Sequence, residues 1–391
     1  MENSISTSKG VLLLAAGIKG AIGTTLAAAV QVLRRTPDRV LPYLMTNGML
    51  PVLGPSVCFE LAGWDVDSID FPKAFERHGV LDTATWSGFV EEVKATPFRA
   101  APDVQRSLAD QIKQIRDDMQ AFISARPGYV PVLVNLLPAG RCQHLDRFAG
   151  VDDILAHAGE IQMPDLAYAL AAIQSGVPVV NFSPNEVDVP ALVDLAAQKG
   201  VPIAGRDGKT GQTYFKMVLA SAMRARKLQV NGWYSLNILG NADGRNLMSP
   251  AHAACKLDNK TGLLEDILGY VPGQKAYGVS SHKVHIDYYA PRGDAKEAWD
   301  VIDFAGLFHL PMSLRLDLLG RDSILAAPLV LDLARWMAAL TIGGRAGAVP
   351  ELAFYFKKSI GERPPKTFQD QLQQIKDLKV YCDRLYSGRK P

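Results

Sequence analysis

The sequence predicts an α/β fold, in which a doubly wound parallel sheet domain is interrupted by an inserted α+β domain. Short apolar runs alternate with helical segments in the first half of the chain, longer β-branched and aromatic runs follow, and helical patterns return near the C-terminus. The 391 residues exceed the usual size of a single domain. We therefore expect residues 1–213 and 323–391 to form one discontinuous domain, and residues 214–322 to form the inserted domain.

The first half of the chain shows apolar strands that alternate with helices. Residues 11–16 are a short apolar run that ends at a glycine, as in a strand buried on both faces, and a helix is expected over residues 24–33. Two further apolar runs, residues 130–137 and 177–182, flank a helical segment over residues 165–174. This alternation is typical of a parallel sheet with helices on both faces.

The middle of the chain favours a second sheet. Residues 228–239 and 283–289 are longer and rich in β-branched and aromatic side chains. Residues 312–318 alternate between apolar and charged side chains. Such alternation predicts strands of a sheet that has one exposed face.

Helices are expected again in the last part of the chain, over residues 324–340, 350–358 and 368–386. The first of these is apolar over a length that could suit a membrane span, but it contains Asp332 and Arg335. Charges inside a bilayer are costly. We therefore predict a buried core helix.

Composition sets limits on the partners of this protein. With 42 basic and 40 acidic residues, the formal net charge of +2 gives no reason to expect nucleic acid or an anionic membrane. Four cysteines lie far apart, at Cys58, Cys142, Cys255 and Cys382. They show neither a disulfide framework nor metal-ligand spacing, and the polar start of the chain shows no signal peptide. We expect structural thiols, no metal site and a cytoplasmic location.

A glycine-rich loop lies between the first strand and its helix, where a Rossmann-type domain binds the pyrophosphate of a dinucleotide. Its candidate cofactor-binding residues are Gly17, Ile18, Lys19, Gly20, Ala21, Ile22 and Gly23. Lys19 stands where the usual fingerprint has its second glycine, so it could crowd a pyrophosphate or neutralise it. Asp65 follows the next apolar segment, and its carboxylate could accept a hydrogen bond from a ribose hydroxyl. The alternatives are a packing turn for the glycines and a turn aspartate for Asp65.

A second loop, residues 205–213, suits a phosphate because a helix-like segment over residues 214–227 follows it. Backbone N–H groups and hydroxyls would converge at the positive end of that helix. The candidate phosphate ligands are Lys209, Thr210, Gly211, Gln212 and Thr213. The alternative is an ordinary turn with Thr210 or Thr213 as the N-cap. The final Gly-Lys-Ser/Thr order of a Walker loop is missing.

Lys256 and Lys260 are four residues apart, so they would stack on one face if this segment is helical. Like charges at that spacing cost about a few tenths of a kcal/mol. One interpretation is a solvated face. The other is an anionic substrate that offsets the repulsion, with one lysine pKa lowered enough for it to act as a base.

Lys296 is a cation in an unfavourable place if its segment is helical. Asp294 and Glu297 predict a helix N-cap with a capping-box glutamate. Lys296 would then lie in the first helical turn, where the helix dipole disfavours a positive charge. This position suggests a functional role for Lys296.

Two other charged segments flank predicted helices. Asp322 or Ser323 opens the helix that starts at residue 324, and helix capping and a substrate role both remain open. Lys357 and Lys358 would close a short helix, where cations are stabilising.

In this order, the motifs resemble those of the myo-inositol-1-phosphate synthase family, also called the inositol-3-phosphate synthase family. The resemblance covers most of the chain. Its most specific strings are Thr-Gly-Gln-Thr at residues 210–213, Gly-Asn-Ala-Asp-Gly at residues 240–244, and Asp-Ser-Ile-Leu-Ala-Ala-Pro at residues 322–328.

The resemblance implies an NAD-dependent isomerase that cyclises D-glucose 6-phosphate to myo-inositol 1-phosphate without net redox change. NAD+ would oxidise C5, the C6 enolate would attack the C1 aldehyde, and NADH would return its hydride to C5. The discontinuous Rossmann-type domain would bind NAD. The inserted domain would carry catalytic residues and the interface of a homotetramer.

The resemblance also implies roles for individual residues. Lys256 would exchange the C5 hydroxyl proton, and the other lysines would hold the phosphate or stabilise the enolate and the aldol oxyanion. The implied catalytic residues are Lys256, Lys260, Lys296, Lys358, Asp207, Asp294 and Asp322. The implied cofactor site adds Asp65, Asp243, Asp322 and Ser323 to the glycine loop, and Lys260 joins the phosphate loop. Lys358 is chosen over Lys357, but the two are not distinguished by the sequence.

Several positions depart from the family pattern. Lys19 replaces a glycine, Ala242 an asparagine and Thr210 a serine, and residues 134–140 and 183–186 also differ. These departures leave NAD or NADP, and the identity of the sugar phosphate, open. The alternatives are a cyclase of the same class acting on fructose 6-phosphate, a sugar-phosphate dehydrogenase, and a non-catalytic NAD(H)-binding sensor.

Overall fold

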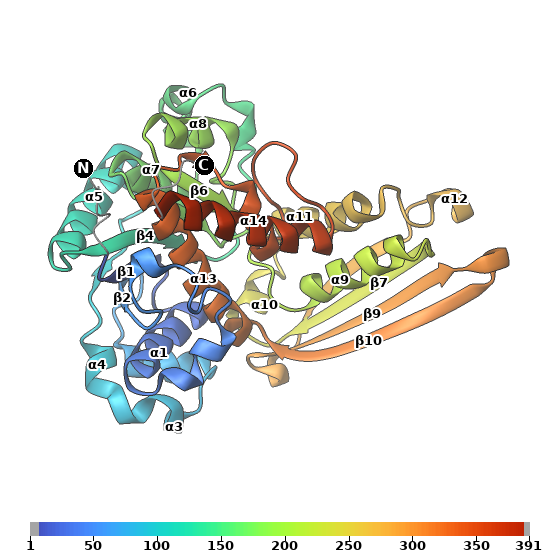
Figure 1. Ribbon diagram of the computed structural model, residues 1–391, viewed down its shortest axis with the longest axis horizontal. Coiled ribbons are helices and arrows are strands. Elements are labelled where there is room, and N and C mark those ends of the chain that lie inside the picture. Colours follow the sequence, from blue (N-terminus) through green and yellow to red (C-terminus); the bar gives the residue numbers. More distant parts are fainter. Residues whose placement is uncertain (1–7, 387–391) are drawn as a thin grey trace.

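A computed structural model describes residues 8–386, apart from the side chains of residues 253–261. Its larger sheet is parallel throughout, with strand order β11-β6-β5-β4-β1-β2-β3 (Figure 1). Its strands are β1 (Gly10–Ala16), β2 (Phe59–Asp65), β3 (Phe98–Ala100), β4 (Tyr129–Asn135), β5 (Val179–Asn181), β6 (Pro202–Gly205) and β11 (Gly347–Ala348). Without the edge strand β11, this is the strand order of the Rossmann fold. The predicted doubly wound α/β class is confirmed.

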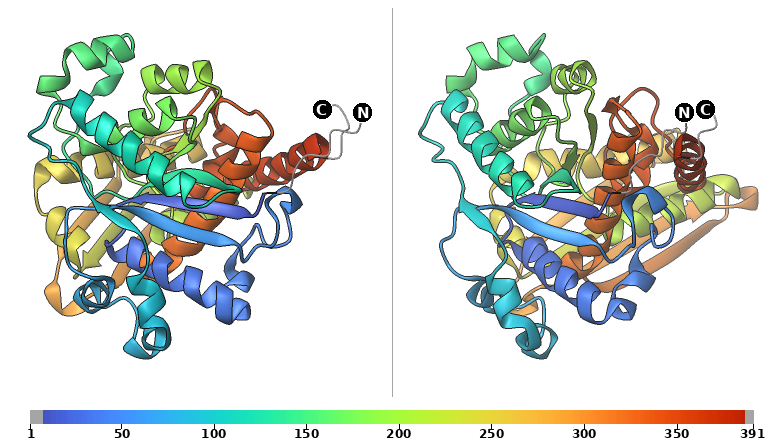
Figure 2. Two further views of the ribbon diagram at one scale, coloured as in Figure 1. Left: turned by 90° about the vertical axis from the view of Figure 1, so that its left-hand side faces the viewer. Right: turned by 60° about the vertical axis from the view of Figure 1, so that its left-hand side comes forward.

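Helices cover both faces of the parallel sheet, which explains why its strands read as continuous apolar runs (Figure 2). Leu13 of β1 faces the side of α1 and α13, while Leu12 and Leu14 face the side of α5, α7 and α8. The covering helices are α1 (Ala21–Arg35), α5 (Leu108–Ser124), α7 (Pro164–Gln174), α8 (Pro190–Gln198), α13 (Asp322–Ile342) and α14 (Phe368–Tyr386). The shorter helices are α2 (Phe71–His78), α3 (Thr83–Trp86), α4 (Val90–Lys94), α6 (Val151–Ala156), α10 (Ala242–Asn246) and α12 (Gln274–Tyr277).

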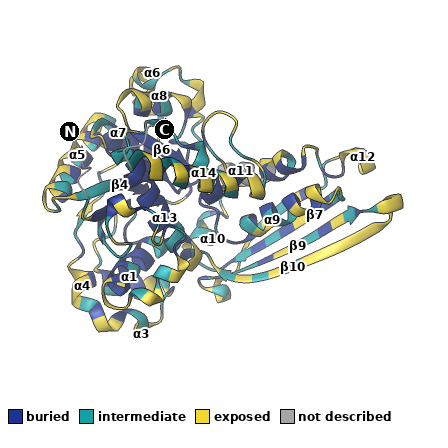
Figure 3. Ribbon diagram, viewed as in Figure 1, coloured by how far each residue is buried: buried dark blue, intermediate teal, exposed yellow. Residues whose placement is uncertain are grey.

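Helix α13 is long and apolar enough, by length and composition, to cross a membrane. However, 72% of its most apolar window is buried inside the protein, and Trp336 and Met337 are fully buried in the core that it shares with α1. Figure 3 shows it as a mostly buried helix at the centre of the molecule. The predicted core helix is confirmed.

The smaller sheet extends away from the parallel sheet, with strand order β10-β9-β7-β8 (Figure 1). Its strands are β7 (Gln229–Leu239), β8 (His282–Tyr288), β9 (Ala295–Ala305) and β10 (Pro311–Arg321). Helices α9 (Gln212–Ala225) and α11 (Pro250–Leu268) cover one face of this sheet, where Trp233 and Ile302 are buried. All four strands come from within the predicted inserted segment. The domain boundaries themselves stay a prediction.

Two predicted helices are wrong. Residues 295–305 form strand β9, so Asp294 and Glu297 are not a helix cap and capping box. β9 lies between β7 and β10, and this pairing overrides the local helix-start pattern. Residues 350–358 form only the 3-10 helix Pro350–Tyr355, after which Phe356 bridges to Gly208.

Candidate active site

A cavity of about 460 Å³ lies at the carboxyl ends of β1, β4, β5 and β6. The strand order of the parallel sheet reverses between β1 and β4, which is where ligands bind in folds of this class. Segments far apart in sequence line the cavity: Gly17, Gly20–Gly23, His78, Leu136–Ala139, Phe182–Pro184, Asp207, Gly208, Thr210, Asn241–Asp243, Asn246, Asp294, Asp322, Ser323 and Lys357. The cavity therefore joins the predicted dinucleotide loop to Asp294, to Asp322 at the start of α13 and to Lys357.

The glycine loop has the geometry that a pyrophosphate requires. Gly17 has a φ of +86°, and a Cβ on Gly23 would lie 2.2 Å from the carbonyl oxygen of Ile18. Helix α1 follows with Gly20 as its N-cap, no side-chain cap and no acidic residue in its first turn. Its N-terminus is thus suited to an anion.

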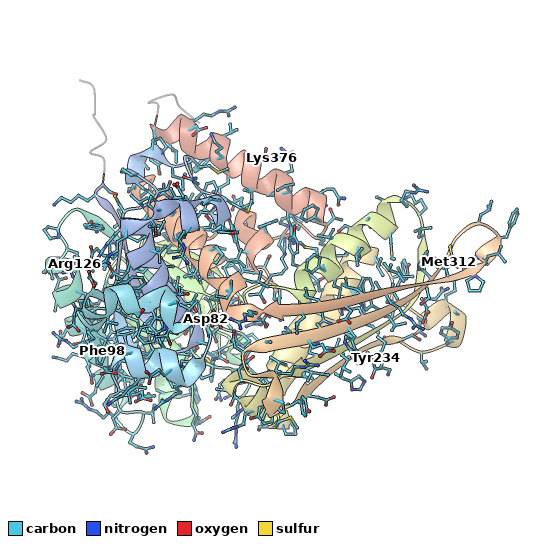
Figure 4. All side chains as sticks on the ribbon, turned by 90° about the horizontal axis from the view of Figure 1, so that it is seen from below. Asp82, Phe98, Arg126, Tyr234, Met312 and Lys376 are labelled. Carbon is cyan, nitrogen blue, oxygen red and sulfur yellow. The ribbon has the colours of Figure 1, made fainter. Side chains whose placement is uncertain are left out.

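Lys19 points away from the cavity. Its Nζ donates to the carbonyl oxygen of Asp67 at 2.7 Å and lies 3.3 Å from the ring centroid of Phe98. Its backbone N–H donates to Asp65 Oδ2 at 2.8 Å. Figure 4 labels Phe98, at the parallel-sheet end of the molecule. Lys19 therefore leaves the pyrophosphate position uncrowded, and a ribose role for Asp65, which does not line the cavity, stays a prediction.

Two ion pairs involve aspartates that line the cavity; of their two lysines, Lys357 is a lining residue and Lys296 is not. Lys357 Nζ lies 2.6 Å from Asp207 Oδ1, and Lys296 Nζ lies 3.0 Å from Asp322 Oδ2. Thr210 donates its hydroxyl to the other oxygen of Asp322 at 2.9 Å. Burial opposes ionisation of Asp322, yet Lys296 and Lys357 hold its pKa well below the usual range. Asp322 therefore carries its charge at neutral pH.

Two buried carboxylate oxygens, on residues that line this cavity, have no hydrogen-bond partner in the described part of the chain. They are Asp207 Oδ2 and Asp294 Oδ2. Burial raises the pKa of Asp294, while hydrogen bonds from Asn241 and Ser323 oppose that rise. Buried acceptors of this kind require donors.

The residues of the predicted phosphate loop lie in different surroundings in the structure. Thr210 lines the cavity, and α9 begins directly after Gly211, which is its N-cap, so neither predicted threonine caps the helix. Gln212 and Thr213 are buried away from the cavity. Lys209 is also turned away: its Nζ donates to Gln371 Oε1 at 2.7 Å, and burial holds its pKa well below the usual value. The loop thus turns the Lys209 side chain toward α14, and Lys209 as a phosphate ligand stays a prediction that only its backbone could meet.

Lys357, not Lys358, reaches the cavity. The bridge between Phe356 and Gly208 makes this segment extended, so consecutive side chains point to opposite sides. Lys358 instead acts electrostatically on Asp188. Of the two lysines that the sequence did not distinguish, the structure therefore places Lys357 at the cavity, and the catalytic role implied for Lys358 stays a prediction.

Three other predicted site residues have mixed outcomes. Asp243 lines the cavity on α10. Lys256 and Lys260 belong to α11, as predicted for a helical segment, but their side chains lie outside the described residues. The roles of all three stay predictions.

A buried amide network below the cavity was missed by the sequence analysis. Asn135 and Asn185 donate to Asp165 Oδ1 at 2.6 and 2.9 Å, and Asn185 Oδ1 accepts from the N–H of Gly140 at 2.9 Å. Burial raises the pKa of Asp165. The network ties together the two loops whose sequences depart from the family pattern. An asparagine at the end of a buried strand, such as Asn135, was the available signal.

Cys142 is disulfide-bonded, so the expectation of structural thiols is wrong for this residue. Cys58 and Cys382 are free thiols, as expected. Among the residues that the structure describes, no group of three or more His, Cys, Asp or Glu side chains could hold a metal ion.

Comparison with known proteins gives consistent matches. The sequence model of a family described as Myo-inositol-1-phosphate synthase matches residues 211–323. Inositol-3-phosphate synthase 1 from Bacteroides thetaiotaomicron is 30% identical over 429 aligned residues, which cover 100% of this chain and 99% of that protein. Inositol-3-phosphate synthase 1-A from Xenopus laevis is also 30% identical, over 76% of this chain but only 56% of its own length. The solved inositol-3-phosphate synthase from Caenorhabditis elegans has the same fold, with a TM-score of 0.83 at 19% identity over 98% of this chain and 87% of that one.

Proposed function

Because the chain belongs to the myo-inositol-1-phosphate synthase family, we propose that it catalyses the NAD-dependent cyclisation of D-glucose 6-phosphate to myo-inositol 1-phosphate. The observation that carries this proposal is the charged wall of the cavity. Lys357 and its partner Asp207 line the cavity beside a loop suited to a dinucleotide, and Lys296 pairs with the lining residue Asp322 from behind the wall. A site that must hold a phosphate and stabilise oxyanions requires such cations.

The residues of the glycine loop fit NAD. The backbone at Gly23 leaves no room for a side chain, and the uncapped start of α1 would hold the pyrophosphate. When bound, NAD+ would supply the hydride acceptor and donor for a transient oxidation at C5, which makes C6 acidic enough for ring closure onto C1. Ser323 and Asp243 line the same cavity and would contact the nicotinamide end.

The lysines would stabilise negative charge on the substrate. Lys296 is held by Asp322, and Lys357 by Asp207, so each ammonium has a fixed position before the substrate enters. Preorganised cations of this kind stabilise charge that develops in a transition state. Lys256 would exchange the C5 hydroxyl proton and Lys260 would bind phosphate, as the motif match implies.

The carboxylates would orient the sugar. Asp207 and Asp294 each have an oxygen without a partner in the described part of the chain, and both line the cavity. Sugar hydroxyls are donors that would satisfy these oxygens. Thr210, which lines the cavity just before α9, would receive the phosphate group together with the backbone N–H groups at the N-terminus of that helix.

We also infer a homotetramer. The face of the smaller sheet opposite α9 and α11 carries Tyr234 and Trp299, which are 45% and 44% exposed. Figure 4 labels Tyr234 on this sheet. Exposed aromatic side chains gathered on one sheet face favour association between protein surfaces.

Incubation of the purified protein with NAD+ and glucose 6-phosphate tests the proposal. Phosphorus NMR should reveal myo-inositol phosphate without accumulation of NADH. Turnover of fructose 6-phosphate but not glucose 6-phosphate would instead support the other cyclase. Stoichiometric NADH would indicate a dehydrogenase, and NAD binding without turnover of either sugar would indicate a sensor.

A further inference from the structure

A buried polar network connects the start of α9 to the smaller sheet. Its central member is Asp300 of β9, which is 1% exposed. Asp300 lies directly opposite Ser235 of β7 in the antiparallel pairing. The proposed reaction uses none of the side chains in this network.

Three donors hold the Asp300 carboxylate. Ser235 Oγ donates to Oδ1 at 2.5 Å, and Trp233 Nε1 donates to the same oxygen at 2.6 Å. Gln212 Nε2 donates to Oδ2 at 2.9 Å. A buried carboxylate is tolerated only with such partners, so its position is tightly determined.

Lys216 adds a cation to the same network. It lies one helical turn after Gln212 on α9, and its Nζ contacts Ser235 Oγ at 2.8 Å and His282 Nε2 at 3.0 Å. Residues four apart lie on the same face of a helix. Gln212 and Lys216 thus attach the first two turns of α9 to the sheet at two points.

Gln212 is the first residue of α9, and Gly211 is the N-cap. The backbone N–H groups of this turn are the donors that a phosphate at the helix N-terminus would use. The Gln212 side chain itself is 3% exposed and does not line the cavity. Its hydrogen bond to Asp300 therefore affects the direction of the helix start and makes no direct contact with the ligand.

We propose that Asp300 is a positioning residue for phosphate binding: through Gln212 it fixes the N-terminal turn of α9 in the orientation that binds the phosphate of the substrate. This inference rests on the proposed function, because it assumes that a phosphate binds at this turn. Ser235 acts one step further away, through Asp300.

The test compares full-length Gln212→Met, Ser235→Ala and the double variant with wild type. Gln212→Met keeps the side-chain volume but removes the donor to Asp300. Tyr270→Phe is the matched control. It removes a different partly buried hydrogen bond, in which the Val230 N–H at the start of β7 donates to the Tyr270 hydroxyl at 2.7 Å. The readouts are the Kd for inorganic phosphate by calorimetry, kcat and KM for glucose 6-phosphate, and the Kd for NAD+.

For Gln212→Met, the expected result is a rise of about 10-fold in the phosphate Kd and in KM, with kcat changed less than about 3-fold, because ground-state binding is lost. Ser235→Ala should give a smaller rise in both constants. The double variant should match Gln212→Met alone, because Ser235 can no longer reach the loop once Gln212 is uncoupled. NAD+ affinity should stay unchanged, and Tyr270→Phe should behave as wild type.

Wild-type phosphate affinity in both single variants, or additive effects in the double variant, would overturn the positioning role alone. Wild-type protein that neither binds phosphate nor turns over glucose 6-phosphate would overturn the proposed function as well. Loss of NAD+ affinity in Gln212→Met together with phosphate affinity would indicate a general structural defect and would also contradict the proposal. Ser235→Ala provides a second, smaller change if Gln212→Met does not fold.

Discussion

Two ion pairs set the electrostatics of the cavity at the scale of single residues. Lys296 with Asp322 and Lys357 with Asp207 hold opposite charges 3.0 and 2.6 Å apart. Both lysines are shielded from water, with side chains 14% and 9% exposed. In such surroundings a cation interacts more strongly with a bound anion than it would at the surface. These two lysines should therefore contribute more to turnover than exposed lysines do.

Adjacent lysines allow this expectation to be tested with matched variants. Lys357→Met should lower kcat/KM for glucose 6-phosphate by about 10²-fold or more, because it removes a preorganised cation and leaves Asp207 buried without its partner. Lys358→Met should have a much smaller effect, because Lys358 does not line the cavity. Steady-state kinetics of the two variants is the measurement. Equal losses, or a larger loss for Lys358→Met, would contradict the assignment.

Substitution of Lys19 should change the affinity for NAD+. The direction of that change shows whether Lys19 orders the glycine loop or crowds the cofactor. Its side chain bonds to Asp67 and stacks on Phe98, so it should stiffen the glycine loop in a conformation that leaves the pyrophosphate position open. Lys19→Gly should then weaken NAD+ binding by about 3- to 10-fold, through the lost contacts and the added chain entropy. Fluorescence titration with NAD+ measures this. Tighter binding would show that Lys19 crowds the cofactor.

At the scale of elements, the sequence pattern predicted the helices and strands whose hydrophobic residues recur with a regular period. The apolar runs of β1 and β4, the core helix α13 and the amphipathic α14 were all located, because burial dictates their hydrophobic spacing. Strand β9 was missed, since Asp294 and Glu297 imitate a helix start and only pairing with β7 and β10 reveals the strand. The direction of the Lys209 side chain, toward Gln371 of α14, was likewise not available from the sequence of its loop.

Helix α9 gives a pH prediction through Lys216. Burial lowers the pKa of Lys216 from 10.5 to about 8, although Asp300 raises it in part. Between pH 8 and pH 10.5, the Lys216 amine is therefore protonated in the unfolded chain and mostly neutral in the folded protein. The free energy of unfolding should therefore rise with pH across this range, by about 3 kcal/mol in total from this group, and the full cost of the buried cation applies below about pH 8.

Denaturant unfolding between pH 7 and 10, in steps of about half a unit, measures this contribution as the difference between wild type and Lys216→Met. The variant should lack the rise, whatever its absolute stability. Parallel stability curves for the two proteins would show that Lys216 does not titrate in this range. Other tyrosines and lysines titrate in both proteins, so their contributions cancel in the difference.

At the scale of the whole molecule, the smaller sheet leaves one face uncovered. Tyr234 and Trp299 lie on that face, and Leu319 of the neighbouring strand β10 is 66% exposed. Figure 3 shows the exposed β10 along the outer edge of this sheet. A chain that associates through this face would bury these side chains while the cavity stays on the parallel-sheet side.

Trp299→Glu should disrupt that association, because it places a charge in the centre of the uncovered face. Light scattering after size exclusion should report a tetramer for wild type and a smaller species for the variant. Trp299 contacts Glu297 through its indole N–H, so Trp299→Phe serves as the control that keeps an aromatic ring. If the Trp299→Glu variant remains a tetramer, the interface lies on another surface of the protein.

The overall plan of the molecule was predictable from the sequence to a greater extent than its cavity. The glycine loop and the strand order follow from local pattern and general topology rules. The cavity depends on contacts between residues more than a hundred positions apart, such as Thr210 with Asp322 and Lys357 with Asp207. No local pattern encodes such a pair, and the sequence therefore did not distinguish Lys357 from Lys358.

The central claim is a redox-neutral cyclisation in which one cofactor molecule removes and returns the same hydride. Turnover of glucose 6-phosphate carrying deuterium at C5, in the presence of NAD+, tests it most directly. NMR and mass spectrometry should find myo-inositol phosphate that keeps one deuterium at the former C5, and absorbance should show no net NADH. Loss of the label to solvent, or NADH formed in proportion to the sugar consumed, would contradict the account.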